Sequence, residues 1–261
     1  MTPINRPTGS LRRFAPLVIL VFAMVLIFSM GWHKLLSLRT VGMNYEWLKA
    51  QIAEHLAISL LIYILTYVAV VALSLPGGLV MTLTGGLLFG WKIGAPATVI
   101  GATTGATIVF LIARSSFGQS LAARAGPWLV KLRDGFKENA LNYLLFLRLV
   151  PAFPFVVVNL APALLNVPLS TYFIGTFLGI IPGSIAYSIA GAGLASIVEA
   201  QNRVYHDCVS KIAATSSNVC EYKIDPSQLV TKELIAAFVA LGIVALIPIV
   251  IKKWSKRDAA A

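Results

Sequence analysis

Arg148 is the residue of this sequence whose type and position could carry the most specific chemistry. It stands in a mostly apolar stretch that begins at Leu141, directly before a segment that contains Pro151 and Pro154. An arginine at the centre of a bilayer costs about 2.5–3.5 kcal/mol on insertion scales, so such a residue is paired, hydrated or functional. Its planar guanidinium can hold a phosphate through two parallel hydrogen bonds. The sequence therefore predicts a binding point for an anionic phosphate headgroup, and the alternative is a positively charged interfacial anchor.

Prolines interrupt the apolar stretch 141–165 three times, with Asn159 inside it and Asn166 directly after it. Proline removes a helical hydrogen bond, so one continuous helix is excluded here. Backbone outside a helix is tolerated at membrane depth only where protein or a watery cavity satisfies its amides. We therefore expect a re-entrant hairpin, in which the two asparagines either cap a half-helix or line a polar path.

A second apolar stretch upstream is interrupted in the same way. Pro76-Gly77-Gly78 ends the preceding helix, and Thr84-Gly85-Gly86 and then Gly90 break the short piece that follows. The stretch carries no charge, which is unusual for a surface loop. It predicts a second re-entrant hairpin with Gly85 and Gly86 at its tip.

Acidic residues are absent from the apolar part of the chain. No Asp or Glu occurs between Glu54 and Asp134, or between Glu138 and Glu199, and the three histidines lie outside or at the ends of the apolar runs. Proton-driven carriers need ionisable groups at membrane depth, and acid–base catalysis and oxygen-rich metal sites need carboxylates. The sequence therefore predicts a protein that is not coupled to protons, has no enzymatic activity and binds neither a metal nor a cofactor.

The composition sets the class of protein that must position these residues. Of the 261 residues, 58% are apolar and 12% are charged, whereas soluble domains carry about 25% charged residues. We expect an all-α polytopic membrane protein with about five to six transmembrane helices and the two interrupted hairpins. The five apolar runs that predict full spans are Phe14–Met30, Leu56–Leu75, Gly94–Ala113, Leu169–Ala190 and Leu234–Ile251.

An internal repeat connects the two halves. A shift of 74 residues lays Gly101 on Gly175 and Gly105 on Gly179, so each half has an interrupted segment followed by a helix with GxxxG spacing. Small residues at this spacing let helices approach closely in lipid. Broken segments at corresponding positions of two halves point to a transport site.

The charges predict how the chain is oriented. Three arginines precede the first apolar run, four basic residues and one acidic residue follow the last, and the stretch 114–140 has five basic against two acidic residues. The stretch 199–233 has four basic against five acidic residues. By the positive-inside rule both termini are cytoplasmic, and 199–233 is an extracytoplasmic polar loop. Five full spans would place the termini on opposite sides, so either one interrupted segment also crosses the membrane fully or one of the five apolar runs does not span it. Because the basic clusters flank apolar runs, they do not indicate a nucleic-acid partner.

Four regions result from this arrangement. Residues 1–55 form an N-terminal anchor and interfacial segment, 56–198 a membrane core, 199–233 the polar loop, and 234–261 a C-terminal helix with a basic tail. Both cysteines, Cys208 and Cys220, fall in the loop. An oxidising compartment would permit a disulfide between them, and the alternative is two independent thiols.

The motifs of the membrane core resemble a known family. The runs Arg148-Leu-Val-Pro-Ala-Phe-Pro-Phe155, Asn159-Leu-Ala-Pro-Ala-Leu-Leu165, Gly179-Ile-Ile-Pro-Gly183 and Gly85-Gly-Leu-Leu-Phe-Gly90 are similar to those of the VTT-domain family, also called SNARE-associated Golgi proteins and related to bacterial DedA proteins. The resemblance covers roughly 74–193. It implies two facing re-entrant hairpins in an inverted repeat, and movement of lipids across the bilayer. DedA proteins carry membrane acidic residues linked to proton-dependent function, and the matching core here lacks them. The positions carried over are Arg148, Pro151, Pro154, Asn159, Gly85, Gly86 and Gly90.

The leading functional hypothesis is a lipid translocator that passes anionic headgroups, of a phospholipid or a polyprenyl phosphate, across the bilayer without proton coupling. A membrane scaffold or assembly factor and a small-solute carrier are the alternatives. Membrane lipids are the expected partners, association into a homo-oligomer stays open, and a bacterial inner (plasma) membrane is the expected location.

Overall fold

The structure is a computed structural model, and it describes residues 22, 24–26, 29–31, 37–75, 77–122, 127–149, 153–212, 220, 235 and 239. All regular secondary structure in these ranges is helical, as the composition predicts. Most of the predicted first span and nearly all of the predicted last span lie outside the described residues. The helices discussed below are α2 (Leu38–Met43), α3 (Tyr45–Glu54), α4 (Leu56–Ala72), α5 (Gly78–Phe89), α6 (Trp91–Ala122), α7 (Pro127–Leu149), α8 (Phe155–Leu164), α9 (Leu169–Gly193) and α10 (Ala195–Ile212).

Two helical segments are long and apolar enough to cross a membrane. They are Trp91–Ser115, which lies within α6, and Leu169–Ser210, which runs through α9 into α10. The helices α4 and α5 are also apolar but shorter. Large apolar side chains of α4, among them Ile58, Leu61, Ile62 and Leu65, are exposed on its outer face.

Helix α5 is continuous through Gly85 and Gly86, so the prediction that these glycines break the helix is wrong. Both glycines are buried where neighbouring helices approach closely, and that packing offsets the weak helix propensity of glycine. The chain turns at Gly90 instead, where φ is +72°. A side chain at this left-handed conformation would be strained, so Gly90 joins α5 to α6 at low cost.

Helix α7 bends sharply at Asn139, which has non-helical φ and ψ angles of −156° and 93°. The Asn139 side chain accepts a hydrogen bond from the backbone N–H of Asn142 at 3.1 Å and thereby caps the second part of the helix. The stretch 141–165 is divided between α7, which ends at Leu149, and α8, which begins at Phe155. Pro162 lies inside α8, so the prediction that it interrupts the helix is wrong. A short turn at Asn166, with φ +57°, then connects α8 to α9.

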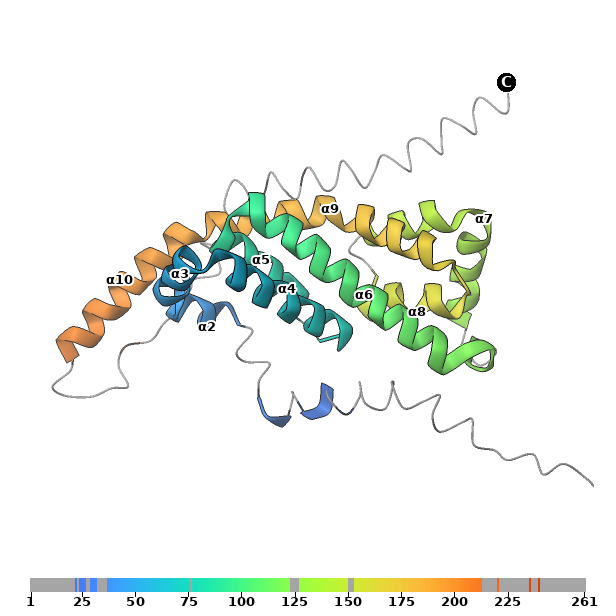
Figure 1. Cartoon of the computed structure of the whole chain (residues 1–261), viewed down its shortest axis with the longest axis horizontal. Coiled ribbons are helices and arrows are strands. Elements are labelled where there is room, and N and C mark those ends of the chain that lie inside the picture. Colours follow the sequence, from blue (N-terminus) through green and yellow to red (C-terminus); the bar gives the residue numbers. More distant parts are fainter. Residues whose placement is uncertain are drawn as a thin grey trace, which may run out of the picture.

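The long helices α6 and α9 form the centre of the bundle (Figure 1). Helix α4 packs on α6, α5 packs mainly on α9 and α6, and α8 packs mainly on α6. Helices α7 and α8 lie at one end of the molecule, and α2, α3 and α10 lie at the other (Figure 1). The stretch 199–233, predicted as a polar loop, begins as helix α10 because its first residues continue the helical segment of α9 with only a brief turn at Leu194.

Candidate functional site

Arg148 lies near the end of α7 and faces α8 and α9. Its Nη2 atom donates toward three neutral oxygens, which are Asn159 Oδ1 at 2.8 Å, Tyr172 Oη at 3.0 Å and Thr176 Oγ1 at 3.0 Å. The guanidinium carbon also lies 5.6 Å from the centre of the Tyr172 ring. The Nη2 end of the guanidinium is therefore held in a fixed orientation by three side chains from two helices.

Tyr172 fixes this cluster to the centre of the bundle. Its ring is fully buried and stacks on Phe110 of α6, with 4.3 Å between ring centres. Its hydroxyl lies within hydrogen-bond distance of Asn159 Oδ1 (2.9 Å) and of the Ala106 carbonyl oxygen (3.2 Å). Three helices, α7, α8 and α9, thus contribute side chains to the Arg148 cluster, which we define as Arg148, Asn159, Tyr172 and Thr176, and α6 packs against it.

Among the described residues, two buried hydrogen-bond donors of the cluster have no partner, Arg148 Nε and Asn159 Nδ2. A buried polar group without a partner costs about 1–3 kcal/mol, so such groups are rare and call for an explanation. Within the described part of the chain no carboxylate forms an ion pair with Arg148. A positive charge and two unsatisfied donors make the cluster suited to an anionic oxygen ligand.

The corresponding polar network of the first half contains no charge. Tyr63 Oη lies 2.7 Å from Thr98 Oγ1 and donates to the Met81 carbonyl at 2.9 Å. Tyr67 likewise pairs its hydroxyl with a threonine of α5, with 2.9 Å between Tyr67 Oη and Thr82 Oγ1. These hydroxyl groups satisfy one another, so this network holds helices together and offers no comparable site for an anion.

Gly179 lets Arg148 approach α9, because a Cβ at this position would lie 2.7 Å from the Arg148 Cβ. One turn earlier, a Cβ at Gly175 would lie 2.8 Å from Leu144 Cδ2. The two glycines of α9 therefore face α7. In the first half, Gly101 and Gly105 of α6 face Tyr67 and Val71 of α4 at similarly short distances.

The other residues singled out from the sequence lie elsewhere. Gly85 packs against the Tyr63 side chain and Gly86 against the backbone of Ser188, so both sit at helix contacts within the bundle. Pro154 is the residue directly before α8. Asn166 is exposed in the turn before α9, and Pro151 lies outside the described residues.

Tyr172 and Thr176 are the cluster members that the sequence analysis does not single out. They are four residues apart and hence on one face of α9. A polar pair at this spacing, on the helix that carries Gly175 and Gly179, is the signal that could have found them.

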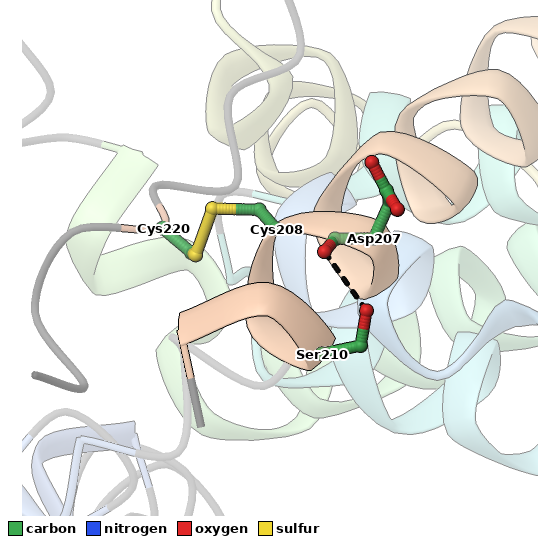
Figure 2. The surroundings of a disulfide bond; sticks show 4 residues. All are labelled: Asp207, Cys208, Ser210 and Cys220. Carbon is green, nitrogen blue, oxygen red and sulfur yellow. Dashed lines mark hydrogen bonds between the residues drawn. A yellow bond between two sulfur atoms is a disulfide. The ribbon is translucent and has the colours of Figure 1, made fainter. Parts of the chain in front are cut away.

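The two cysteines are joined at the opposite end of the molecule. Cys208 of α10 and Cys220 form a disulfide with Cα atoms 5.9 Å apart, and Figure 2 shows it beside the hydrogen bond from Ser210 Oγ to the Asp207 carbonyl. The disulfide ties the segment that follows α10 back onto this helix.

Helix α10 is also fixed to α3 by charged groups. Lys49 Nζ lies 3.3 Å from Glu199 Oε1, and the buried Tyr45 donates its hydroxyl to the same carboxylate oxygen at 3.4 Å. Tyr45, and then Glu199, raise the pKa of Lys49 above its usual value, because both stabilise the ammonium form.

Comparison with known proteins supports the resemblance carried by the motifs. Residues 75–193 match the VTT domain. The chain is 38% identical over 135 residues to a transmembrane protein 41 homolog of Dictyostelium discoideum. This alignment covers 50% of this chain and 40% of that protein. It is 36% identical over 138 residues to a transmembrane protein 41 homolog of Caenorhabditis elegans (50% and 54% coverage) and 30% identical over 149 residues to transmembrane protein 41B of Danio rerio (56% and 52%). The matched segment thus spans about half the length of these relatives. No solved structure matches this chain.

Proposed function

Because this chain carries the VTT domain over residues 75–193, in line with its sequence motifs, we propose that it is an integral membrane lipid translocator. It passes anionic headgroups, of a phospholipid or a polyprenyl phosphate, across the bilayer. It performs no covalent chemistry, needs no cofactor and is not coupled to protons. Its partners are the membrane lipids themselves, and its location is a bacterial inner membrane with both termini in the cytoplasm.

The observation that carries this proposal is the uncompensated charge of the Arg148 cluster. A lipid phosphate loses its hydration when it leaves the membrane surface, and the protein must replace the lost hydrogen bonds. Arg148 supplies the positive charge, while its Nε and the Asn159 Nδ2 supply the free donors. A purely structural arginine would be expected to pair with a carboxylate or to use all its donors internally.

The short helices support a pathway that does not consist of full spans alone. Helices α5 and α8 have 12 and 10 residues, which correspond to about 18 Å and 15 Å of helix. Both are too short for a hydrocarbon core of about 30 Å. We infer that α5 and α8 are the half-helices of two re-entrant hairpins in an inverted repeat, each packed against the long helix of the other half.

The experiment that tests this function is a headgroup-flipping assay in proteoliposomes. A fluorescent phospholipid and a fluorescent polyprenyl phosphate are reconstituted with wild type, Arg148→Ala or the control Lys92→Ala, which removes an exposed positive charge at the start of α6. Wild type and the control should expose inner-leaflet probe to an external quencher, and Arg148→Ala should reduce this rate at least about tenfold. The probe that moves faster identifies the lipid class.

Two further arms separate the alternatives. A pH difference across the membrane should leave the wild-type rate unchanged, because the hairpins and their flanking spans contain no carboxylate. If Arg148→Ala folds and flips lipids as fast as wild type, the cluster is structural and a scaffold role takes precedence. If wild type moves neither lipid but releases trapped small anions, the protein is a solute carrier.

A further inference from the structure

A second polar pocket lies at the end of the bundle where α7 faces the turn between α8 and α9. It has a volume of about 340 Å³, and it is lined by Arg133, Phe136 and Lys137 of α7 and by Asn166 and Pro168 of the turn, among others. Arg133 and Lys137 are exposed, while Phe136 is buried beneath them. The pocket therefore has an apolar floor and two cations at its mouth.

Positive charge dominates this pocket. Arg133 and Lys137 are one helical turn apart on the same face of α7. Arg114 of α6 adds a third cation at this turn, where its Nη1 donates to the Val167 carbonyl at 3.4 Å. The neighbouring carboxylates Asp134 and Glu138 do not line the pocket, and within the described ranges neither forms an ion pair with these cations.

The start of α9 adds to the positive potential. Pro168 precedes the helix, no side chain caps its first amides, and its first turn contains no acidic residue. Free amides and the helix dipole at an N-terminus favour a nearby anion. The charges on α7 and this uncapped terminus act on the same pocket.

The pocket and the Arg148 cluster lie along the same helices. Pro168 at the pocket is four residues from Tyr172, which corresponds to about 6 Å of helix. Ala140 lines the pocket and stands eight residues before Arg148, or about 12 Å. Leu164 lines it too and is five residues from Asn159. The cluster is thus about one to two helical turns deeper in the bundle than the pocket.

We propose that the pocket between Arg133, Lys137 and Asn166 binds a phosphate group and serves as the docking site from which a lipid headgroup reaches the Arg148 cluster. The assignment of the lipid rests on the proposed function, whereas phosphate binding at the pocket does not. The volume of about 340 Å³ suits a phosphorylated headgroup. Docking here raises the local concentration of anionic lipid beside the pathway.

Binding is measured with the full chain in nanodiscs of zwitterionic phosphatidylcholine, using fluorescent phosphatidic acid as the lipid probe and glycerol 3-phosphate as the soluble probe. The test variant is Arg133→Gln/Lys137→Gln, and the control Lys92→Gln/Arg203→Gln removes the same charge from exposed positions outside the pocket. The test variant should weaken phosphate binding at least about tenfold, and the control should stay within about twofold. Equal binding by both variants overturns the proposal.

The two probes identify the source of the phosphate. Tight binding of phosphatidic acid with no competition from glycerol 3-phosphate assigns the pocket to lipid headgroups. Equal competition by glycerol 3-phosphate assigns it to free phosphate esters and overturns the docking role.

The flipping assay keeps this proposal separate from the function. The Arg133→Gln/Lys137→Gln variant should need a higher fraction of anionic lipid for half-maximal rate but retain the maximal rate, whereas Arg148→Ala should lose the maximal rate and keep phosphate binding. If Arg133→Gln/Lys137→Gln flips lipid as wild type does at every lipid fraction, the docking role is wrong and the function stands. If wild type flips no lipid, the function fails and the binding measurement alone decides the phosphate site.

Discussion

Within the part of the chain that the structure describes, Arg148 keeps its charge in contact with neutral partners only, and this is the main chemical feature of the site. Its three acceptors are an amide, a phenol and a hydroxyl oxygen. These orient the guanidinium without neutralising it, so its attraction for an anion is preserved. A carboxylate in the same place would form a tight internal ion pair and compete with any ligand.

Asn159→Asp tests this reasoning with an almost isosteric change. The new carboxylate would lie where Asn159 Oδ1 now lies, 2.8 Å from Arg148 Nη2. We expect the rate of anionic lipid flipping to fall at least about tenfold, because the internal pair satisfies the cation. The thermal unfolding temperature of the purified protein should not fall, since the pair replaces a hydrogen bond with a stronger one. Flipping at the wild-type rate would mean that the free charge of Arg148 is not used.

Glycines set the distance between helices α5 and α9. Gly86 of α5 meets the backbone of Ser188, and Gly191 of α9 meets the backbone of Leu83. The two helices therefore cross in direct backbone contact at two points. This close crossing allows a helix of only 12 residues to be held firmly against α9.

Gly86→Ala should disrupt this crossing, because its Cβ would collide with the Ser188 carbonyl, which cannot rotate away. We expect a loss of about 1–3 kcal/mol in the free energy of unfolding. Gly183→Ala is the matched control on α9, where a Cβ would meet nothing within 4 Å, and it should be neutral or stabilise by up to about 1 kcal/mol. Thermal or denaturant unfolding in detergent measures both. Equal stability of the two variants would refute close α5–α9 packing.

Some residues of the site and some helix boundaries can be predicted from the sequence, and others cannot. Arg148 and Asn159 are evident because a cation and an amide contrast with an apolar stretch. Tyr172 and Thr176 are not, since such residues are ordinary in an apolar helix and only the tertiary contact shows that they face Arg148. Likewise, Gly85 and Gly86 suggest a break on propensity alone, whereas tertiary packing keeps α5 helical through them.

The whole molecule has two chemically different ends. The basic pocket of Arg133 and Lys137 lies at the α7–α8 end, and the disulfide lies at the α10 end (Figure 1). The helical segment from Leu169 to Ser210 has 42 residues, or about 63 Å, which is twice the hydrocarbon thickness. We therefore expect the polar helix α10 to project beyond the bilayer on the side opposite the basic pocket.

This arrangement predicts that the disulfide faces an oxidising compartment and the basic pocket faces the cytoplasm. Cys208 and Cys220 are the only cysteines, so the denatured protein should take up no maleimide before reduction and two equivalents after it.

In a chain carrying Cys208→Ser and Cys220→Ser, a membrane-impermeant maleimide added to intact cells should label Ser210→Cys but not Lys137→Cys. Permeabilised cells should label both, because both positions are exposed. Labelling of both in intact cells would contradict opposite sides, and labelling of Lys137→Cys alone would invert the orientation and place the phosphate pocket on the outer surface.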